Sequence, residues 1–299
     1  SKQINIDQLK NIVIKTKPSN LNSLILNRIK KGKLIANLEI YFKENLKVDN
    51  FIAKGEVTKL NGAINKNLIL KKTSFNFFAD NSDLLIKNVK SQMNGFLIKD
   101  GNIKVERDKN INIKSEFFSE VDLNKKNIQN YLPYLMNNNF INKQTHIKGT
   151  LNHNLNLIFD STFKVTNYSY KSRGKIKKSN LKLSKSINNI FLENDINVLS
   201  LKDSDIEVRY GSDKKNYISS SGNYSLDNQN FKSYKIKNNF LEDSLKIELD
   251  LELAEKLNID LINYKKNKNI DAMISVKFEK KKKLINFKEI NYKENKNFI

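Results

Sequence analysis

Few residues in this 299-residue chain have the chemistry that catalysis or metal binding requires. Cysteine is absent and the only histidines are His146 and His153, which excludes thiolate sites and multi-histidine metal sites. Seven positions separate the two histidines, so a strand would place them on opposite faces. Neither has a serine or a carboxylate at motif spacing, and we interpret both as surface or edge residues.

Two further patterns are typical of binding sites, but both are incomplete. Asp203 and Asp205 have the spacing of calcium-loop ligands, yet no glycine or glutamate follows at the loop positions. The 9 glycines are isolated, so no phosphate-binding loop is predicted. The row of Glu248, Asp250 and Glu252 is most simply the wet face of a two-faced strand. The sequence therefore predicts no catalytic residue, no metal site, no cofactor and no enzyme.

The chain is strongly basic, with a formal net charge of +22, but arginine contributes little of this charge. It contains 50 lysines, 4 arginines and 48 asparagines, a bias that A/T-rich codons would produce. Proteins that read nucleic acids rely on the planar arginine fork, which binds phosphate and guanine with two hydrogen bonds. We therefore expect no specific nucleic-acid recognition. Non-specific attraction to anionic surfaces, including lipid headgroups, stays open.

The length allows one large domain or two ordinary ones. No stretch approaches the roughly 18 consecutive apolar residues of a membrane-spanning helix. The chain starts at Ser1 without an initiator methionine or a signal peptide, and it stops at Ile299 without a capping signal. We expect it to be an internal piece of a longer protein.

The main structural signal is the alternation of apolar and polar residues, which is typical of half-buried β-strands. The pair Asp100-Gly101 and the segment 108–110 interrupt two such alternating runs, so we predict turns there and a β-meander over 95–123. Long alternating stripes return over 245–253 and 270–278. The alternation predicts one apolar face that contains Leu38, Ile40, Phe42, Phe75, Phe77, Phe96, Ile98, Ile103, Val105, Ile111 and Ile113.

Other segments break the alternation. Residues 19–31, with Gly32 as the helix-terminating residue, and residues 125–137, with Pro133 inside, have the apolar spacing of short amphipathic helices. The polar stretch 211–223 is a candidate long loop, and the lysine run 280–283 is a candidate hairpin turn. No clear linker divides the chain, so we treat 1–299 as a single section.

These patterns predict a mainly β, antiparallel protein with two short helices. Its apolar rows could be buried in a sandwich, in a closed barrel, or along a long sheet that curls so that its apolar face lines a groove. Alternation alone does not choose among the three.

A family resemblance favours the curled sheet. KKGKLIANLEIYF, DNFIAKGEVTKLNGAI and LILKKTSFNFFADNSDLLIKN, between Lys30 and Asn88, resemble the central region of AsmA-like proteins of the Gram-negative envelope. The YhdP branch is the nearer one, and TamB is more distant. YLPYL (Tyr131–Leu135), IKGTLNHNLNL and VTNYSYKSRGKIKKSNLKL (Val165–Leu183) fit the same plan, so the resemblance covers roughly 18–185.

The resemblance implies a bridge-like phospholipid transporter and not an enzyme. Such proteins are anchored in the inner membrane by an N-terminal helix, which this chain lacks. They cross the periplasm as a taco-like β-sheet whose apolar groove carries phospholipid toward the outer membrane. The family has no short catalytic motif to transfer, so the lining residues are those that the alternation predicts. Protein partners are not predicted.

Two other function classes stay open beside a lipid-transfer section. A structural or adhesive β-rod of the cell envelope would show a regular short repeat, and we find no fixed period. A non-specific nucleic-acid-binding protein would cluster its positive charge with aromatic platforms on one face. Here the lysines are dispersed along the chain.

Overall fold

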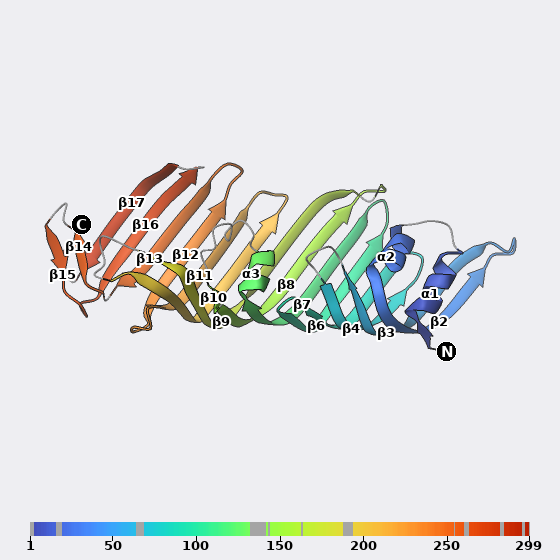
Figure 1. Ribbon diagram of the computed structural model, residues 1–299. Helices are drawn as coiled ribbons and strands as arrows, with labels where there is room; N and C mark the ends of the chain where they lie inside the picture. The colour runs from blue at the N-terminus through green and yellow to red at the C-terminus, as the bar shows by residue number, and fades with distance from the viewer. Residues whose placement is uncertain are drawn as a thin grey trace. The chain divides into compact units, whose positions relative to one another are not determined.

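The structure is a computed structural model of the chain. It describes residues 3–15, 20–63, 69–131, 142, 144–162, 164–187, 194–253, 255–259, 263–281, 284–294 and 297–298. Most of these residues lie in strands. The main sheet contains 16 strands, which pair in sequence order (Figure 1). β14 and β15, which lie between β13 and β16 in the sequence, form a separate hairpin. The predicted class, mainly β with a long antiparallel sheet, is confirmed.

The strands of the sheet vary from two to 23 residues in length. The first nine are β1 (Ile4–Asn5), β2 (Ile29–Phe42), β3 (Val48–Ala63), β4 (Ile69–Ala79), β5 (Asp83–Met93), β6 (Phe96–Arg107), β7 (Ile111–Asn124), β8 (His146–Phe159) and β9 (Val165–Ile187). The others are β10 (Ile196–Gly211), β11 (Asn216–Leu226), β12 (Lys232–Phe240), β13 (Leu245–Leu253), β14 (Leu257–Ile259), β15 (Tyr264–Lys266), β16 (Ala272–Lys281), β17 (Leu284–Glu294) and β18 (Asn297–Phe298).

The chain divides into two compact units, which are described separately. The first unit contains Ser1–Val121 and Asn152–Ser169, and the second contains Asp122–Leu151 and Tyr170–Ile299. The single section over 1–299 stays a prediction.

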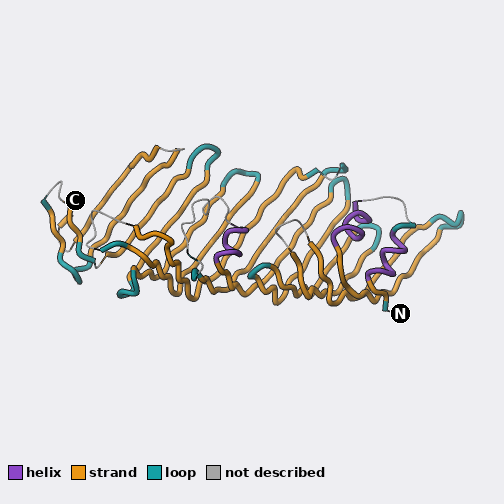
Figure 2. The backbone as a smooth tube through the Cα atoms, viewed as in Figure 1, coloured by secondary structure: helices purple, strands orange, loops and turns teal. Residues whose placement is uncertain are grey.

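The described residues contain three helices, where the sequence predicts two (Figure 2). The additional helix, α1 (Ile6–Val13), begins at a capping box in which Asn5 and Gln8 exchange side-chain to backbone hydrogen bonds. It buries Ile6 and Val13. Its 8 residues give too few turns for the periodicity to stand out in the sequence.

The two predicted helices form, and the first of them is shorter than expected. α2 (Asn20–Arg28) ends where β2 begins, so Gly32 lies within a strand and does not terminate the helix. The described residues of the second helix, α3, are Lys125–Tyr131, and Pro133 lies outside the described residues with the rest of the predicted helix. Ile128 of α3 is only 3% exposed and packs against Leu123, Ile147 and Leu181 in the second unit.

The structure corrects one predicted turn. Asp100 and Gly101 lie inside β6, which runs without a break from Phe96 to Arg107. The turn that precedes this strand is at Asn94 and Gly95, both with positive φ, as an Asn-Gly hairpin requires. Gly101 serves packing instead, because a Cβ atom there would lie 2.1 Å from the Phe117 ring. The predicted turn at 108–110 does form, between β6 and β7.

The predicted loop over 211–223 is mostly strand. Only Ser212–Lys215 connect β10 with β11, and Asn216 begins the next strand. The lysine run does lie in a hairpin, because Lys281 pairs with Leu284 across the β16–β17 turn, although Lys282 and Lys283 lie outside the described residues.

A line of β-bulges crosses neighbouring strands of the first unit. The pairing shifts near Lys59 in β3 and near Lys72 in β4, and both residues have positive φ. Asn88 in β5 has positive φ at the same level, and the β6–β7 register shifts between Ile98 and Asp100. Each bulge bends its strand and increases the local twist.

The molecule leaves an unusually large surface in contact with solvent. Its accessible area is 20157 Å² for a mass of 34.8 kDa. Two separate compact domains of half that mass would expose about 16,000 Å² together. The excess arises because the strands form mainly one layer, so most apolar side chains stay half-exposed.

The best-packed described core lies in the second unit. The β14–β15 hairpin folds onto the sheet there, and Leu253, Leu257, Ala272 and Tyr292 are buried together. Tyr264 of the hairpin shares a 2.8 Å hydroxyl hydrogen bond with Tyr292 of β17. The hairpin therefore covers one end of the apolar rows of β13, β16 and β17.

We predict that Gly55→Ala destabilises the first unit. The added Cβ would lie 2.1 Å from the Ile35 carbonyl oxygen on β2 and 3.0 Å from the Phe77 ring on β4. Gly55 is central in the sheet, so the expected loss is about 2–4 kcal/mol in the free energy of unfolding, measured by urea denaturation.

Gly32→Ala is the matched control, because its Cβ would meet Leu60 at an ordinary 3.5 Å. We expect no loss there and up to about 1 kcal/mol of gain. Equal effects of the two substitutions would contradict the close strand approach at Gly55.

Candidate functional site

The strand register of the first unit gathers the apolar residues of β2, β3 and β4 on one face. Opposite residues in an antiparallel pair point to the same side of the sheet. Leu38 lies opposite Ala53, which lies opposite Ala79, and Gly55 lies opposite Phe77. Alternation along each strand extends this face. On these strands it contains Leu34, Ala36, Leu38, Ile40, Phe51, Ala53, Gly55, Val57, Thr73, Phe75, Phe77 and Ala79.

The same face continues across β5, β6 and β7. Ile86 lies opposite both Phe77 and Ile103, and Val105 lies opposite Ile113. β7 alternates regularly, so its partners show which β6 residues share the face. The members on these strands are Leu84, Ile86, Ser91, Met93, Phe96, Ile98, Gly101, Ile103, Val105, Ile111, Ile113, Ser115, Phe117, Ser119 and Val121. We call the whole surface on β2–β7 the apolar face.

The register brings the predicted residues together on the apolar face. Ten of the eleven are connected through strand pairs, and Phe42 follows by alternation with Ile40 on β2. None of the eleven is fully buried. Leu38 and Phe42 are 60% exposed, whereas the eight on β4, β6 and β7 are half-buried.

Several members of the apolar face escape the sequence analysis. Phe51 and Val57 of β3 alternate with small residues, so their row looks weak in the sequence. On β5, Leu84, Leu85 and Ile86 form a continuous apolar run without alternation. The bulge at Asn88 then reverses which residues face the apolar side, and only the pairing reveals this.

Small polar residues are buried on the apolar face between the larger side chains. The hydroxyls of Thr73 and Ser91 share a 2.7 Å hydrogen bond between β4 and β5. Ser115 donates to the Leu155 carbonyl oxygen at 3.4 Å, and Ser119 is fully buried. Such hydroxyls have low burial cost when they are paired.

His153 corrects the prediction that both histidines lie at the surface or at an edge. Its Nε2 atom is 2.7 Å from the Ser119 hydroxyl, and its ring meets Phe96 edge-on at 6.0 Å between centroids. Burial lowers the pKa of His153 to about 4 from the ordinary 6.5. Ser119 has no exposed surface, so a substrate cannot reach this serine–histidine pair without rearrangement.

His146, in contrast, is partly exposed and lies in the second unit. Its Nε2 atom is 2.5 Å from the Asp122 carboxylate.

The opposite face of the first unit carries charged side chains. Lys104 forms a 2.6 Å ion pair with Glu106, which Lys114 approaches at 3.7 Å. Lys99 pairs with Glu120 at 3.2 Å. These exposed ion pairs stabilise the fold little, but their charges keep this face of the sheet hydrated.

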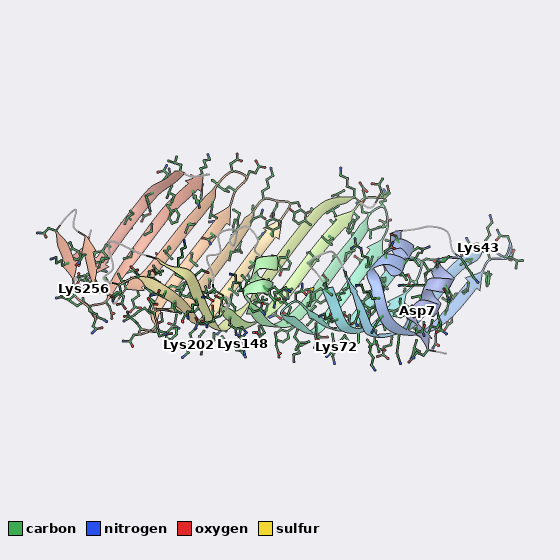
Figure 3. All side chains as sticks on the ribbon, in the orientation of Figure 1. Asp7, Lys43, Lys72, Lys148, Lys202 and Lys256 are labelled. Atoms are coloured by element: carbon green, nitrogen blue, oxygen red, sulfur yellow. The ribbon has the colours of Figure 1, made fainter. Side chains whose placement is uncertain are left out.

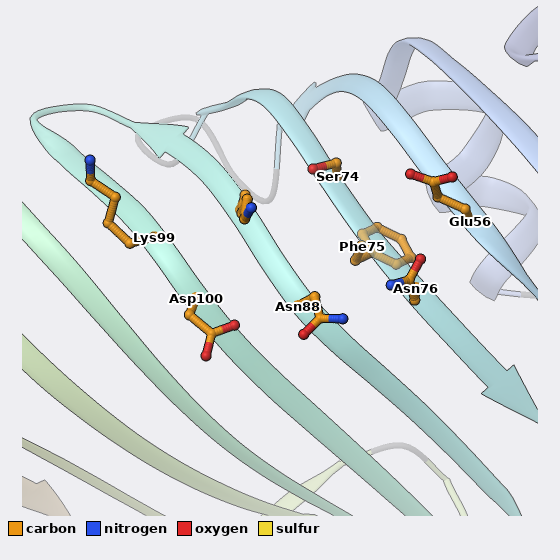
Figure 4. Close-up of a pocket in the computed structure, with 8 residues that line it drawn as sticks. Glu56, Ser74, Phe75, Asn76, Asn88, Lys99 and Asp100 are labelled. Atoms are coloured by element: carbon orange, nitrogen blue, oxygen red, sulfur yellow. The ribbon is translucent and has the colours of Figure 1, made fainter.

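An open depression of about 510 Å³ lies near the bulges of the first unit (Figure 4). Glu56, Asp100, Lys90 and Lys99 contribute two negative and two positive charges to its lining. All four are exposed, which favours a wet surface over a ligand site.

The second unit has an apolar face of its own. Ile236 of β12 lies opposite Leu249 of β13, which lies opposite Val276 of β16. Val276 lies opposite Ile290 of β17. The predicted stripe over 245–253 thus belongs to a face, and the carboxylates Glu248 and Asp250 point to its other side. The second predicted stripe begins at Ala272 and not at Ile270.

Among the described His, Asp and Glu residues, no three or more lie close enough together to hold a metal ion. None of the described helices is sufficiently long and apolar to cross a bilayer.

The pKa of His153 predicts a pH dependence of stability. Between about pH 6.5 and pH 4 the unfolded chain binds a proton at this histidine that the native fold does not. The free energy of unfolding should therefore fall by about 2 kcal/mol from this residue alone when the pH drops from about 7.5 to about 5.

Urea denaturation of the native protein and of His153→Leu at both pH values measures this contribution. The variant should lose less stability on acidification, because it lacks the histidine that the unfolded chain protonates. The carboxylates titrate in both proteins, so their effect cancels in the comparison. An identical pH dependence in the two proteins would contradict a neutral, buried His153.

Comparisons with known proteins leave the chain without a demonstrated family. No family model matches it, and neither a curated protein nor a solved structure is significantly similar to it.

Proposed function

We propose that this chain is a section of a lipid carrier whose apolar face accepts phospholipid acyl chains. The observation that carries the proposal is the apolar face of the first unit, where strands β2–β7 align their apolar rows while the side chains stay half-exposed. The two described helices of this unit pack chiefly against β2. Soluble proteins rarely leave so much contiguous apolar surface without a ligand or a partner.

The composition of the apolar face suits a sliding ligand. Each methylene of an acyl chain that leaves water contributes about 0.8 kcal/mol. Phenylalanine, isoleucine and leucine side chains supply this contact without geometric demands. The polar groups among them, such as Thr73 and Ser91, are already hydrogen-bonded within the sheet. A lipid would therefore meet no fixed polar anchor at these residues.

We propose further that the sheet curls, so that the apolar face lines a groove. The bulges near Lys59, Lys72, Asn88 and Asp100 support this proposal, because they lie at one level of neighbouring strands. Bends at one level add up along a sheet and turn its two margins toward the same side.

The resemblance to AsmA-like envelope proteins suggests the cellular setting that we propose. In this proposal the chain lies in the periplasm, as part of a longer protein anchored in the inner membrane, and phospholipid is carried between the inner and outer membranes. The chain would then act without a cofactor, a catalytic step or a specific nucleic acid.

Lipid extraction and mass spectrometry of the protein purified from cells test the proposal. We expect reproducible phospholipid in the native protein. Phe77→Lys and Val105→Lys each place a charge on the apolar face. Each should weaken the binding of a fluorescent fatty acid by about tenfold, because roughly two methylene groups of the acyl chain lose their apolar contact.

Asn102→Lys is the matched control, because Asn102 lies on β6 but on the exposed charged face. It should leave lipid binding unchanged. A stable native protein that contains no lipid and binds no fatty acid would refute lipid carriage and favour a structural β-rod.

A further inference from the structure

The β2–β3 hairpin extends beyond its neighbouring strands. β4 pairs with β3 only from Ala53 onward, and β1 pairs with β2 only at Lys33 and Leu34. Residues 39–42 and 48–52 therefore have ladder partners only in each other among the described pairings, and Leu38 pairs with Ala53. We call residues 38–52 the β2–β3 tip; Figure 3 labels Lys43 at its end.

The β2–β3 tip is rich in apolar side chains, although most of its residues are exposed to solvent. Leu46 is 82% exposed and Val48 is 55% exposed. The other exposed apolar residues of the tip are Leu38, Ile40, Tyr41 and Phe42. This patch continues the apolar face, since Ile40 lies opposite Phe51.

Leu46 occupies a backbone position that does not suit it. Its φ is 61°, in the left-handed region that favours glycine and asparagine. Among the described non-glycine residues with positive φ, it alone has an apolar side chain; the others are lysine, asparagine or aspartate. Two backbone hydrogen bonds hold this turn, from Lys43 N to Lys47 O at 2.8 Å and from Leu46 N to Lys43 O at 2.9 Å.

Other turns at this edge of the sheet are polar. Asp80, Asn81 and Ser82 connect β4 with β5, and residues 108–110 connect β6 with β7. An exposed leucine in a strained turn costs folding free energy and gives no internal packing in return. A role in binding explains its presence.

We propose that the β2–β3 tip inserts into the interfacial region of a lipid bilayer. Tyr41 and Phe42 supply the aromatic groups that favour this region, and Lys43 and Lys47 can extend their ammonium groups toward headgroups. The tip exposes Phe42 on one face and Tyr41 on the other, with Leu46 at the end. A bilayer surrounds all of these side chains, whereas a protein docked on one face would leave the other wet.

Apolar insertion and not charge attraction provides the binding. The tip contains three carboxylates, Glu39, Glu44 and Asp49, against two lysines, and Lys43 pairs with Asp49 at 3.4 Å. The net charge of +22 of the whole chain would draw it to any anionic surface. Neutral vesicles at high salt separate the two effects. The inference goes beyond lipid carriage and does not depend on it.

The natural chain has no tryptophan, so Leu46→Trp introduces a single fluorescent reporter at the end of the tip. We expect its emission to shift to the blue when phosphatidylcholine vesicles are added at high salt, and brominated lipid to quench it. Lys109→Trp is the matched control in the polar β6–β7 turn, and its emission should stay unchanged.

Leu46→Asn tests the same side chain without a reporter. Asparagine tolerates positive φ, so this variant should be at least as stable as the native protein to urea. Its co-sedimentation with phosphatidylcholine vesicles should nevertheless weaken by about tenfold, because one leucine no longer leaves water.

Three outcomes would overturn the insertion: the same emission shift at both reporters, vesicle binding that Leu46→Asn leaves unchanged, or a shift at position 46 that depends on protein concentration and not on vesicles. The last would indicate contact between copies of the chain. The test is separate from that of lipid carriage. Phe77→Lys and Val105→Lys should leave vesicle docking intact, and Leu46→Asn should leave fatty-acid binding intact.

Discussion

The structure depends on one constraint, the period-two alternation of side chains in an antiparallel ladder that has mainly one layer. Each strand puts its apolar residues on one side, and pairing in sequence order joins the rows within each unit into a face. A sandwich or a barrel would bury such a face in a second layer. Here most side chains of the apolar face stay half-exposed, so hydrophobic surface is available for binding.

A single-layer sheet must obtain its shape from backbone irregularities. The bulges of β3–β6 shift the register and reverse which residues point to the apolar side, yet the face stays apolar across them. This works because residues near the bulges are small or carry paired hydroxyls, such as Gly101 beside Phe117, or Thr73 with Ser91. Larger side chains would prevent the close approach of neighbouring strands.

The few well-packed places are those where another element covers the sheet. α3 buries Ile128, and the β14–β15 hairpin buries Leu257 against Ala272 and Tyr292. His153 shows the same physics on a smaller scale, because burial against Phe96 and Ser119 holds it neutral. The β2–β3 tip is the contrary case, because Leu46 is exposed at the end of a hairpin whose last residues pair with no third strand among the described pairings.

The amino-acid pattern is enough to predict the fold class and part of the apolar face, because alternation depends only on local strand geometry. The alternation alone predicts that Phe77, Val105 and Ile113 lie on one side of the sheet. The residues at which strands begin, and the side of the sheet that residues face after a bulge, depend on the tertiary structure. Asp100-Gly101 has the composition of a turn but lies within β6, since the Phe117 ring on β7 requires a glycine opposite it. His153 and Ser119 likewise lie 34 positions apart in the sequence, and only strand pairing brings them together. Contacts between strands that are distant in sequence produce no periodic pattern in the sequence of either strand.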